Sequence, residues 1–392
     1  MLFTCGERGN ATPGRQAMIK RSGKNFAIDV HCHVYTPAAD DLVKEAYIGK
    51  NDPDPLTHFA SERSRNYNRQ QRKKLLGHLT SVEKRVAEMD RMGIDVQAVS
   101  TAPFQFYYSV EPDLCRKTAR LVNESLAEIV ASRPDRFVAL GTVPMQEPAL
   151  AVAELVYCVE KLGFRGLEIG TNVAGVDLSD TRFDRVFARA EELGAVIFLH
   201  PHGFTEARRF ADHYLTNVVG HPLDTTLALS HLIFGGVLDR YPRLKIISAH
   251  GGGYLSHYPG RTDFAYKVRP ECRDHIKRPP SSYLKKVYFD TVVFSHAQLE
   301  YLVKVWGAHR LVMGTDYPFD MGDHMPIDFL NGAKYLTRAE KDLIIGRNAA
   351  RLLKIRLPAG RARRRKAKSR KRAPPWERAS GSTSTHFNRE DQ

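Results

Sequence analysis

Histidines and an aspartate follow apolar runs at four places in the sequence. His31 and His33 stand one residue apart after the run FAIDV, and the runs AVIFLH, LKIISAH and HRLVMGTD end at His200, His250 and Asp316. Side chains alternate along a strand, so His31 and His33 face the same side and can bind one metal ion together. Imidazoles with a carboxylate suit zinc or a similar divalent ion that keeps a position open for water. Each residue alone could be structural, but their coincidence at strand ends favours a metal site.

The elements that must position these residues alternate regularly along the chain. Eight short apolar runs are separated by amphipathic stretches such as VEKRVAEMDRMG and RFDRVFARAEELG, which have helical spacing and end in glycine. This pattern predicts an α/β fold, and eight strands favour a (β/α)8 TIM barrel over a doubly wound open sheet. In a TIM barrel the carboxyl ends of the strands form the active-site face, where the four strand-end positions would meet. The eight runs are FAIDV, DVQAVS, FVALGTV, RGLEIG, AVIFLH, LKIISAH, KVYFDTV and HRLVMGTD.

Composition divides the chain into three parts. We expect a loose segment at 1–25, a barrel domain at 26–355 with an insertion at about 36–81, and a basic disordered tail at 356–392. The tail carries 12 Lys and Arg against 3 Asp and Glu, which is nine of the net charge of +15. Such a tail could bind nucleic acid, but a solvated tail without a specific partner is the favoured interpretation.

Cysteine usage and hydropathy limit the cellular setting. The five cysteines are scattered without CxxC spacing, which fits a reducing compartment and no disulfide framework. No apolar run reaches the roughly 18–20 residues that span a bilayer, and the first residues contain no apolar segment of a secretory signal. We therefore expect a cytoplasmic protein with no membrane partner.

The motifs IDVHCH, LHP, AHGGG and GTDYPF, in this order, resemble those of the amidohydrolase superfamily. The closest resemblance is to its amidohydrolase 2 branch, the decarboxylating branch of the 2-amino-3-carboxymuconate 6-semialdehyde decarboxylases. It extends to stretches without catalytic residues, such as EMDRMGIDVQAVSTAP and FGGVLDRYPRLKI. The resemblance implies a distorted (β/α)8 barrel of the metal-dependent hydrolase type with one divalent metal ion, most commonly Zn²⁺ with Mn²⁺ as the alternative.

The resemblance also implies roles for individual residues. It assigns metal binding to His31, His33, His200 and Asp316, and catalysis to His250 and Asp316. It assigns substrate binding to Arg261, which in the family reaches into the site of the neighbouring subunit, so a homodimer is implied. A single metal ion is further favoured because the fourth strand carries Glu168 in place of the bridging lysine of binuclear relatives.

The implied reaction is the decarboxylation of a small unsaturated or aromatic carboxylic acid through a metal-bound hydroxide, without an organic cofactor. The alternative is a hydrolase or hydratase that acts on a lactone or unsaturated diacid on the same scaffold. Two departures from the family leave the substrate open. His202 in HPHG replaces a tryptophan at a substrate-contacting position, and the insertion offers several candidates for a second substrate-binding arginine. These candidates are Arg63, Arg65, Arg69 and Arg72.

Overall fold

The computed structural model describes residues 26–46, 59–204 and 206–357. The chain divides into two units, Met1–Pro358 and Ala359–Gln392, and the second unit lies outside the described residues. The predicted loose segment at 1–25, part of the predicted insertion and nearly all of the predicted basic tail also lie outside them. The predicted domain boundaries therefore stay predictions.

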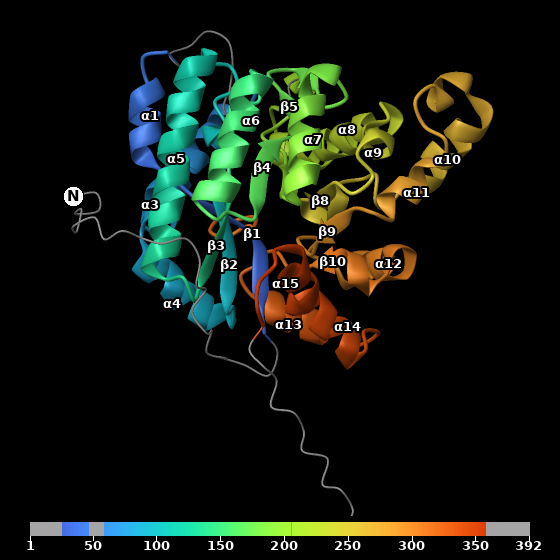
Figure 1. The fold of residues 1–392 in the computed structure, drawn as a ribbon. Coiled ribbons are helices and arrows are strands. Elements are labelled where there is room, and N and C mark those ends of the chain that lie inside the picture. The colour runs from blue at the N-terminus through green and yellow to red at the C-terminus, as the bar shows by residue number, and fades with distance from the viewer. Residues whose placement is uncertain (1–25, 47–58, 205, 358–392) are drawn as a thin grey trace, which may run out of the picture. The chain divides into compact units, whose positions relative to one another are not determined.

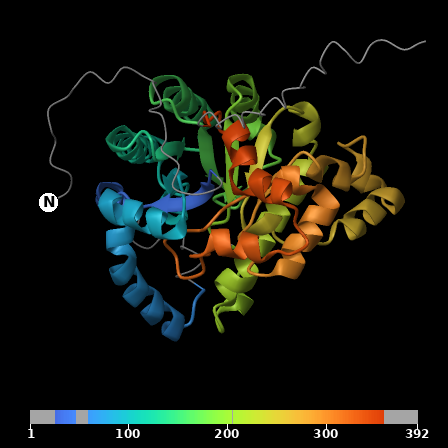
Figure 2. The same ribbon diagram turned by 90° about the horizontal axis from the view of Figure 1, so that it is seen from below.

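Eight parallel strands form one sheet in the order β1-β2-β3-β4-β7-β8-β9-β10. The order follows the sequence, and each neighbouring pair is joined in parallel register. Helices surround the strands (Figures 1 and 2), as the alternating pattern predicts. The strands are β1 Ile28–Val34, β2 Val96–Thr101, β3 Phe137–Gly141, β4 Gly166–Gly170, β7 Val196–His200, β8 Lys245–Ser248, β9 Tyr288–Asp290 and β10 Leu311–Val312.

The last strand and the segment after it return to the first strand and close the sheet. Val30 N donates to Met313 O at 3.0 Å, His33 N donates to Tyr317 O at 2.8 Å, and Asp316 N donates to His31 O at 2.8 Å. These bonds do not form a regular ladder, because β10 is only two residues long. The prediction of a distorted (β/α)8 barrel is confirmed, and the competing open sheet is wrong.

The helices begin and end at the signals that the sequence carries. Ser81 caps α4 by accepting a hydrogen bond from Lys84 N, and α4 ends at Gly93 in the left-handed conformation. The helices are α1 Pro37–Val43, α3 Glu62–Thr80, α4 Val82–Met92, α5 Pro112–Ser132, α6 Pro148–Val156, α7 Asp184–Leu193, α8 His221–Phe234, α9 Val237–Arg240, α10 Pro259–Val268, α11 Pro280–Leu284, α12 His296–Trp306, α13 Pro326–Gly332, α14 Arg338–Asp342 and α15 Asn348–Leu352. A small hairpin, β5 Asn172–Val173 with β6 Val176–Asp177, follows β4.

No helix in the described ranges is both long and apolar enough to cross a bilayer.

Two apolar clusters hold the barrel together. The larger one joins the strands to the surrounding helices, and the smaller one gathers side chains from alternate strand positions, including Val138, Val196 and Phe198. Phe198 packs its ring against His31, with ring centroids 4.9 Å apart, and against His200 at 5.8 Å. The histidines at the strand ends therefore rest on a close-packed apolar floor that restricts their movement.

Candidate metal centre

Four buried side chains from β1, β7 and the segment after β10 converge at the carboxyl ends of the strands. One ligand atom from each of His31, His33, His200 and Asp316 lies within 4.8 Å of every other. Among the described residues, the Nε2 atoms of the three histidines and Oδ1 of Asp316 make no hydrogen bond. Buried polar atoms almost always have a partner, so four convergent atoms without one indicate that a bound group completes them.

The outer nitrogens of the three rings fix their orientation. His31 Nδ1 lies 2.6 Å from Asp290 Oδ2, His33 Nδ1 lies 3.0 Å from Thr101 O, and His200 Nδ1 lies 2.8 Å from Pro201 O. Each partner can only accept, so each Nδ1 carries a proton, and each Nε2 points to the centre, where it can offer a lone pair to an ion that displaces any second proton. This is the arrangement that metal-binding histidines adopt in proteins.

The separations between these atoms agree with a metal centre. His31 Nε2 and His33 Nε2 lie 3.3 and 3.2 Å from Asp316 Oδ1. Ligands bound tetrahedrally at about 2.0–2.1 Å from an ion lie about 3.3–3.4 Å apart, since the edge of a tetrahedron is about 1.6 times its radius. These two separations therefore match those of ligands around one divalent ion.

Burial and mutual charge shift the protonation of these groups. Burial disfavours the charged form of His31, but Asp316 and Asp290 outweigh it and raise the pKa of His31 to about 10. Burial opposes ionisation of Asp316, yet His31, His250 and His33 hold its pKa well below the usual range. Burial and the neighbouring histidines lower the pKa of His200. One ionised carboxylate among closely spaced imidazoles is an environment that attracts a cation.

His250 lies beside the four convergent residues without joining them. Its Nε2 is 3.4 Å from Asp316 Oδ2, the carboxylate oxygen that does not face His31 and His33. His250 adopts a positive φ of 54° and is followed by three glycines that also have positive φ. Asp290 supports this strained turn, because it accepts hydrogen bonds from His250 N at 3.0 Å and Gly251 N at 2.8 Å.

A second buried carboxylate holds the segment that carries Asp316. Asp29 accepts from Thr315 N at 3.1 Å, from Thr315 Oγ1 at 2.7 Å and from Gln97 Nε2 at 2.9 Å. These bonds tie β1, β2 and the segment after β10 together, so Asp316 keeps its place although its φ is 60°. Burial raises the pKa of Asp29 to about 6.

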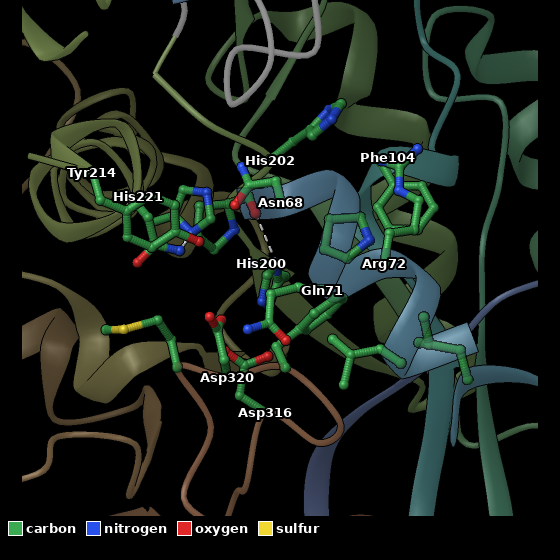
Figure 3. A pocket seen from close by; sticks show the side chains of 17 residues that line it. Asn68, Gln71, Arg72, Phe104, His200, His202, Tyr214, His221, Asp316 and Asp320 are labelled. Atoms are coloured by element: carbon green, nitrogen blue, oxygen red, sulfur yellow. Dashed lines mark hydrogen bonds between the residues drawn. The ribbon is translucent and has the colours of Figure 1, made fainter. Parts of the chain in front are cut away.

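A cavity opens above this centre. Figure 3 shows His200 and Asp316 between two walls, with Arg72 and Phe104 on one side and Tyr214 and His221 on the other. The first wall comes largely from α3, whose lining side chains are three or four residues apart and so share one helix face. The lining residues are Asn68, Gln71, Arg72, Leu75, Leu79, Pro103, Phe104, His200, Pro201, His202, Tyr214, Asn217, His221, Asp316, Phe319, Asp320 and Met321.

Comparisons with known proteins agree with this architecture. The family model described as Amidohydrolase matches residues 28–355. The chain belongs to the amidohydrolase family. A 2-amino-3-carboxymuconate-6-semialdehyde decarboxylase from Dictyostelium discoideum is 35% identical over 270 residues, which cover 69% of this chain and 75% of that protein. A gamma-resorcylate decarboxylase from Rhizobium sp. (strain MTP-10005) is 32% identical over 296 residues, which cover 69% of this chain and 86% of that protein.

Solved structures of two amidohydrolase-type decarboxylases share the fold. The 5-carboxyvanillate decarboxylase from Sphingomonas paucimobilis has a TM-score of 0.76 at 26% identity and covers 85% of this chain and all of its own. A dihydroxybenzoic acid decarboxylase from Polaromonas sp. JS666, solved with bound manganese and the inhibitor 2-nitroresorcinol, has a TM-score of 0.72 at 25% identity. It covers 84% of this chain and 97% of its own. The two relatives and the two solved structures named above are all decarboxylases.

Only some of the predicted substrate-binding residues of this amidohydrolase line the cavity. His202 lines the cavity, and Arg72 is the one of the four candidate arginines that does so. The Arg72 guanidinium lies over the Phe104 ring at 5.2 Å from its centroid. Arg65 instead donates to Ala60 O at 2.5 Å. Arg261 is exposed on α10 and does not line the cavity of its own chain.

Two residues of the amidohydrolase site are missing from the sequence prediction. Asp290 is the last residue of β9, so the rule of ionisable residues at strand ends identifies it as readily as Asp316. His221 is the first residue of α8, a place that no spacing rule connects with the centre. Glu168, which stands in place of the bridging lysine of binuclear relatives, lies within β4. It is fully buried, with Oε1 3.7 Å from His33 Nδ1, and burial raises its pKa to about 7.

Proposed function

We propose that this protein is a metal-dependent, non-oxidative decarboxylase of a small aromatic or unsaturated carboxylic acid. The observation that carries the proposal is the convergence of His31, His33, His200 and Asp316 at the floor of a cavity whose wall presents Arg72. An arginine can bind a carboxylate through two parallel hydrogen bonds, which fits an acid as substrate. Decarboxylases among the relatives and structural neighbours support the same reaction class.

The four convergent side chains would hold one divalent ion per chain. Three imidazoles and one carboxylate suit Zn²⁺, and we propose it as the physiological ion. Mn²⁺ is the competing candidate, since the Polaromonas decarboxylase contains manganese. When bound, the ion supplies positive charge that stabilises negative charge on the substrate and lowers the pKa of water.

The remaining steps belong to the side chains around the centre. Arg72 orients the substrate carboxylate, and the apolar face of Phe104 beside it excludes water from one wall. His250 and Asp316 face each other at 3.4 Å, so a proton can be held between them and delivered to the substrate carbon that bears the carboxylate. The proton forms the new carbon–hydrogen bond with an electron pair of the unsaturated system. Cleavage of the carbon–carbon bond then releases CO2, and the electron pair of that bond restores the unsaturated system.

We further propose that the active form is a homodimer in which Arg261 enters the site of the partner subunit. α10, which carries Arg261, has no buried residue, and Phe264 within it is 63% exposed, while Tyr258 directly before it is 65% exposed. Exposed aromatic side chains of this size are typical of interface cores. His202 is proposed as a further substrate contact. The described cysteines are free, which supports a cytoplasmic location.

The test is release of CO2 from candidate acids by the metal-loaded full chain. The acids are 2,6-dihydroxybenzoate, 5-carboxyvanillate and 2-amino-3-carboxymuconate 6-semialdehyde, and turnover in D2O should place one deuterium on the carbon that loses CO2. Chelator-treated protein serves as a control and should release none, and His250→Ala should release CO2 roughly 10²–10⁴-fold more slowly. Consumption of an acid or lactone without CO2 would instead establish a hydrolase or hydratase.

A further inference from the structure

His221 occupies the cavity wall opposite Arg72 and plays no part in the chemistry described above. It is the first residue of α8, the residue is 9% exposed, and Figure 3 shows it on the side of Tyr214. Its ring lies nearly parallel to that of His250, with centroids 6.1 Å apart and an interplanar angle of 24°. A group bound against His221 would therefore also lie close to His250.

The hydrogen bonding of the ring shows which of its two nitrogens is left without a partner. Asn217 Nδ2 lies 3.3 Å from His221 Nδ1, and an amide nitrogen can only donate. Nδ1 is therefore the acceptor, and the proton of the neutral ring sits on Nε2. Within the described part of the chain, Nε2 has no hydrogen-bond partner. Burial lowers the pKa of His221 to about 3, so the ring is a neutral donor under ordinary conditions.

The backbone around His221 is held firmly, so the donor has a fixed position. Asp224, one turn further along α8, hydrogen-bonds with Thr171 Oγ1, and Asn172 Nδ2 donates to its other oxygen at 3.5 Å. These bonds attach the start of α8 to the segment after β4. Buried polar atoms mostly have a partner, whereas His221, in the cavity wall, satisfies Nδ1 and leaves Nε2 without one among the described residues.

We propose that His221 is a specificity-determining residue that donates a hydrogen bond from Nε2 to an oxygen substituent on the substrate ring, other than the carboxylate that Arg72 binds. The inference rests on the proposed function and narrows its substrate class to aromatic acids that carry a ring hydroxyl or methoxyl group. A neutral donor matches such an oxygen, whereas a second carboxylate would call for a cation. An analogue that lacks the oxygen leaves a buried donor unpaired and is disfavoured.

The experiment measures binding of nitro compounds, in which the nitro group stands in for the carboxylate. Calorimetric titration of the metal-loaded full chain compares 2-nitrophenol with 2-nitroresorcinol, 3-nitrocatechol and 2-nitrohydroquinone, which add one hydroxyl at different ring positions. The wild-type protein should bind at least one dihydroxy compound about tenfold more tightly than 2-nitrophenol. His221→Phe keeps an aromatic ring against His250 but lacks the donor, so this preference should disappear. His221→Gln can place an amide donor near Nε2 and should keep part of it.

The outcomes separate this inference from the proposed function. A preference that survives in His221→Phe, or that is absent from the wild-type protein, overturns the role of His221 and leaves the decarboxylase proposal standing. Equal weakening of all four compounds in both variants indicates a structural role and also overturns it. If the wild-type protein binds none of the compounds and releases no CO2 from any tested acid, both proposals fail. Metal content and melting temperature of each variant confirm that the protein compared is folded and loaded.

Discussion

Asp290 accepts a hydrogen bond from His31 Nδ1 at 2.6 Å, and the same carboxylate oxygen accepts from the backbone amide of His250 at 3.0 Å. One oxygen atom thus fixes both the orientation of a residue proposed to bind metal and the position of the residue proposed to move protons. The other oxygen accepts from Gly251 N and Val292 N at 2.8 and 3.1 Å. Each oxygen of the Asp290 carboxylate therefore accepts two hydrogen bonds. No neutral side chain can replace Asp290 without the loss of at least one of these bonds.

Asp290→Asn should weaken metal binding by about 10- to 100-fold, the usual effect of removing the hydrogen-bond partner of a metal-binding histidine. An asparagine presents a donor to one of the groups that now donate to Asp290, so either His31 or the His250 turn loses its support. Competition with a fluorescent chelator measures the affinity. Asp113→Asn, whose parent side chain is 78% exposed, is the matched control and should bind metal like the wild-type protein. Unchanged affinity in Asp290→Asn would refute the positioning role.

His200→Ala and His250→Ala should have opposite effects on metal content. The wild-type protein should contain about one divalent ion per chain, and His200→Ala should lose it because one of four ligands is missing. His250→Ala should keep the ion, while turnover falls by roughly 10²–10⁴-fold, the usual contribution of a general acid or base. Elemental analysis of both variants decides the matter. Two ions in the wild-type protein, or equal metal loss in both variants, would contradict this division of roles.

Arg72→Met should reduce kcat/KM for the acid substrate by roughly 10- to 100-fold, because a charge-assisted hydrogen bond contributes about 1.5–3 kcal/mol. Arg69→Met is the matched control, since Arg69 lies on the same helix, is exposed and hydrogen-bonds with Asn66 instead of lining the cavity. Steady-state kinetics of CO2 release compares the two variants. Equal losses in both would show that the charge of α3 as a whole, and not the position of Arg72, matters.

The stability difference between Asp224→Asn and the wild-type protein should depend on pH. Burial raises the pKa of Asp224 from 3.8 to about 7, with Asp177 adding to the effect and hydrogen bonds from Thr171 and Asn172 opposing it. The folded state therefore favours the protonated acid. Its contribution to stability is complete below about pH 4 and is lost as the pH rises through 7.

Asp224→Asn, which cannot ionise, should therefore gain stability relative to the wild-type protein between pH 4 and 7, by up to about 4 kcal/mol. Thermal or urea unfolding of both proteins at several pH values measures the difference. A difference that stays constant over this range would show that Asp224 is ionised in the fold.

Arg261 can be tested by mixing two inactive variants. If Arg261 acts in the partner's site, a dimer formed from one His250→Ala chain and one Arg261→Met chain contains one site with both residues intact. Partial activity should return once subunits exchange. Fluorescence energy transfer between labelled chains confirms the exchange, and no recovery after confirmed exchange would exclude a shared site.

The sequence predicts the barrel and the four convergent side chains because both depend on local order. Strand ends are visible as apolar runs, and parallel strands bring their carboxyl ends to one face. His221 cannot be predicted in this way, since it reaches the cavity from the start of a helix, and its distance from His250 depends on how α8 packs. The choice of Arg72 among the four candidate arginines likewise depends on which face of α3 points to the cavity. The sequence of α3 does not show this, because the helix is polar and has little apolar periodicity.

The irregular closure between β10 and β1 has a consequence for what the ion does to the barrel as a whole. His31 and Asp316 lie on the two sides of the least regular junction in the sheet, where only scattered backbone bonds join the first and last strands. An ion bound by both residues would link two positions that are 285 residues apart in the chain. Its binding free energy then adds to the stability of the closed ring. Without the ion, we expect the barrel to open first at the junction of β10 and β1. Loss of the ion should therefore also lower the stability of the whole barrel.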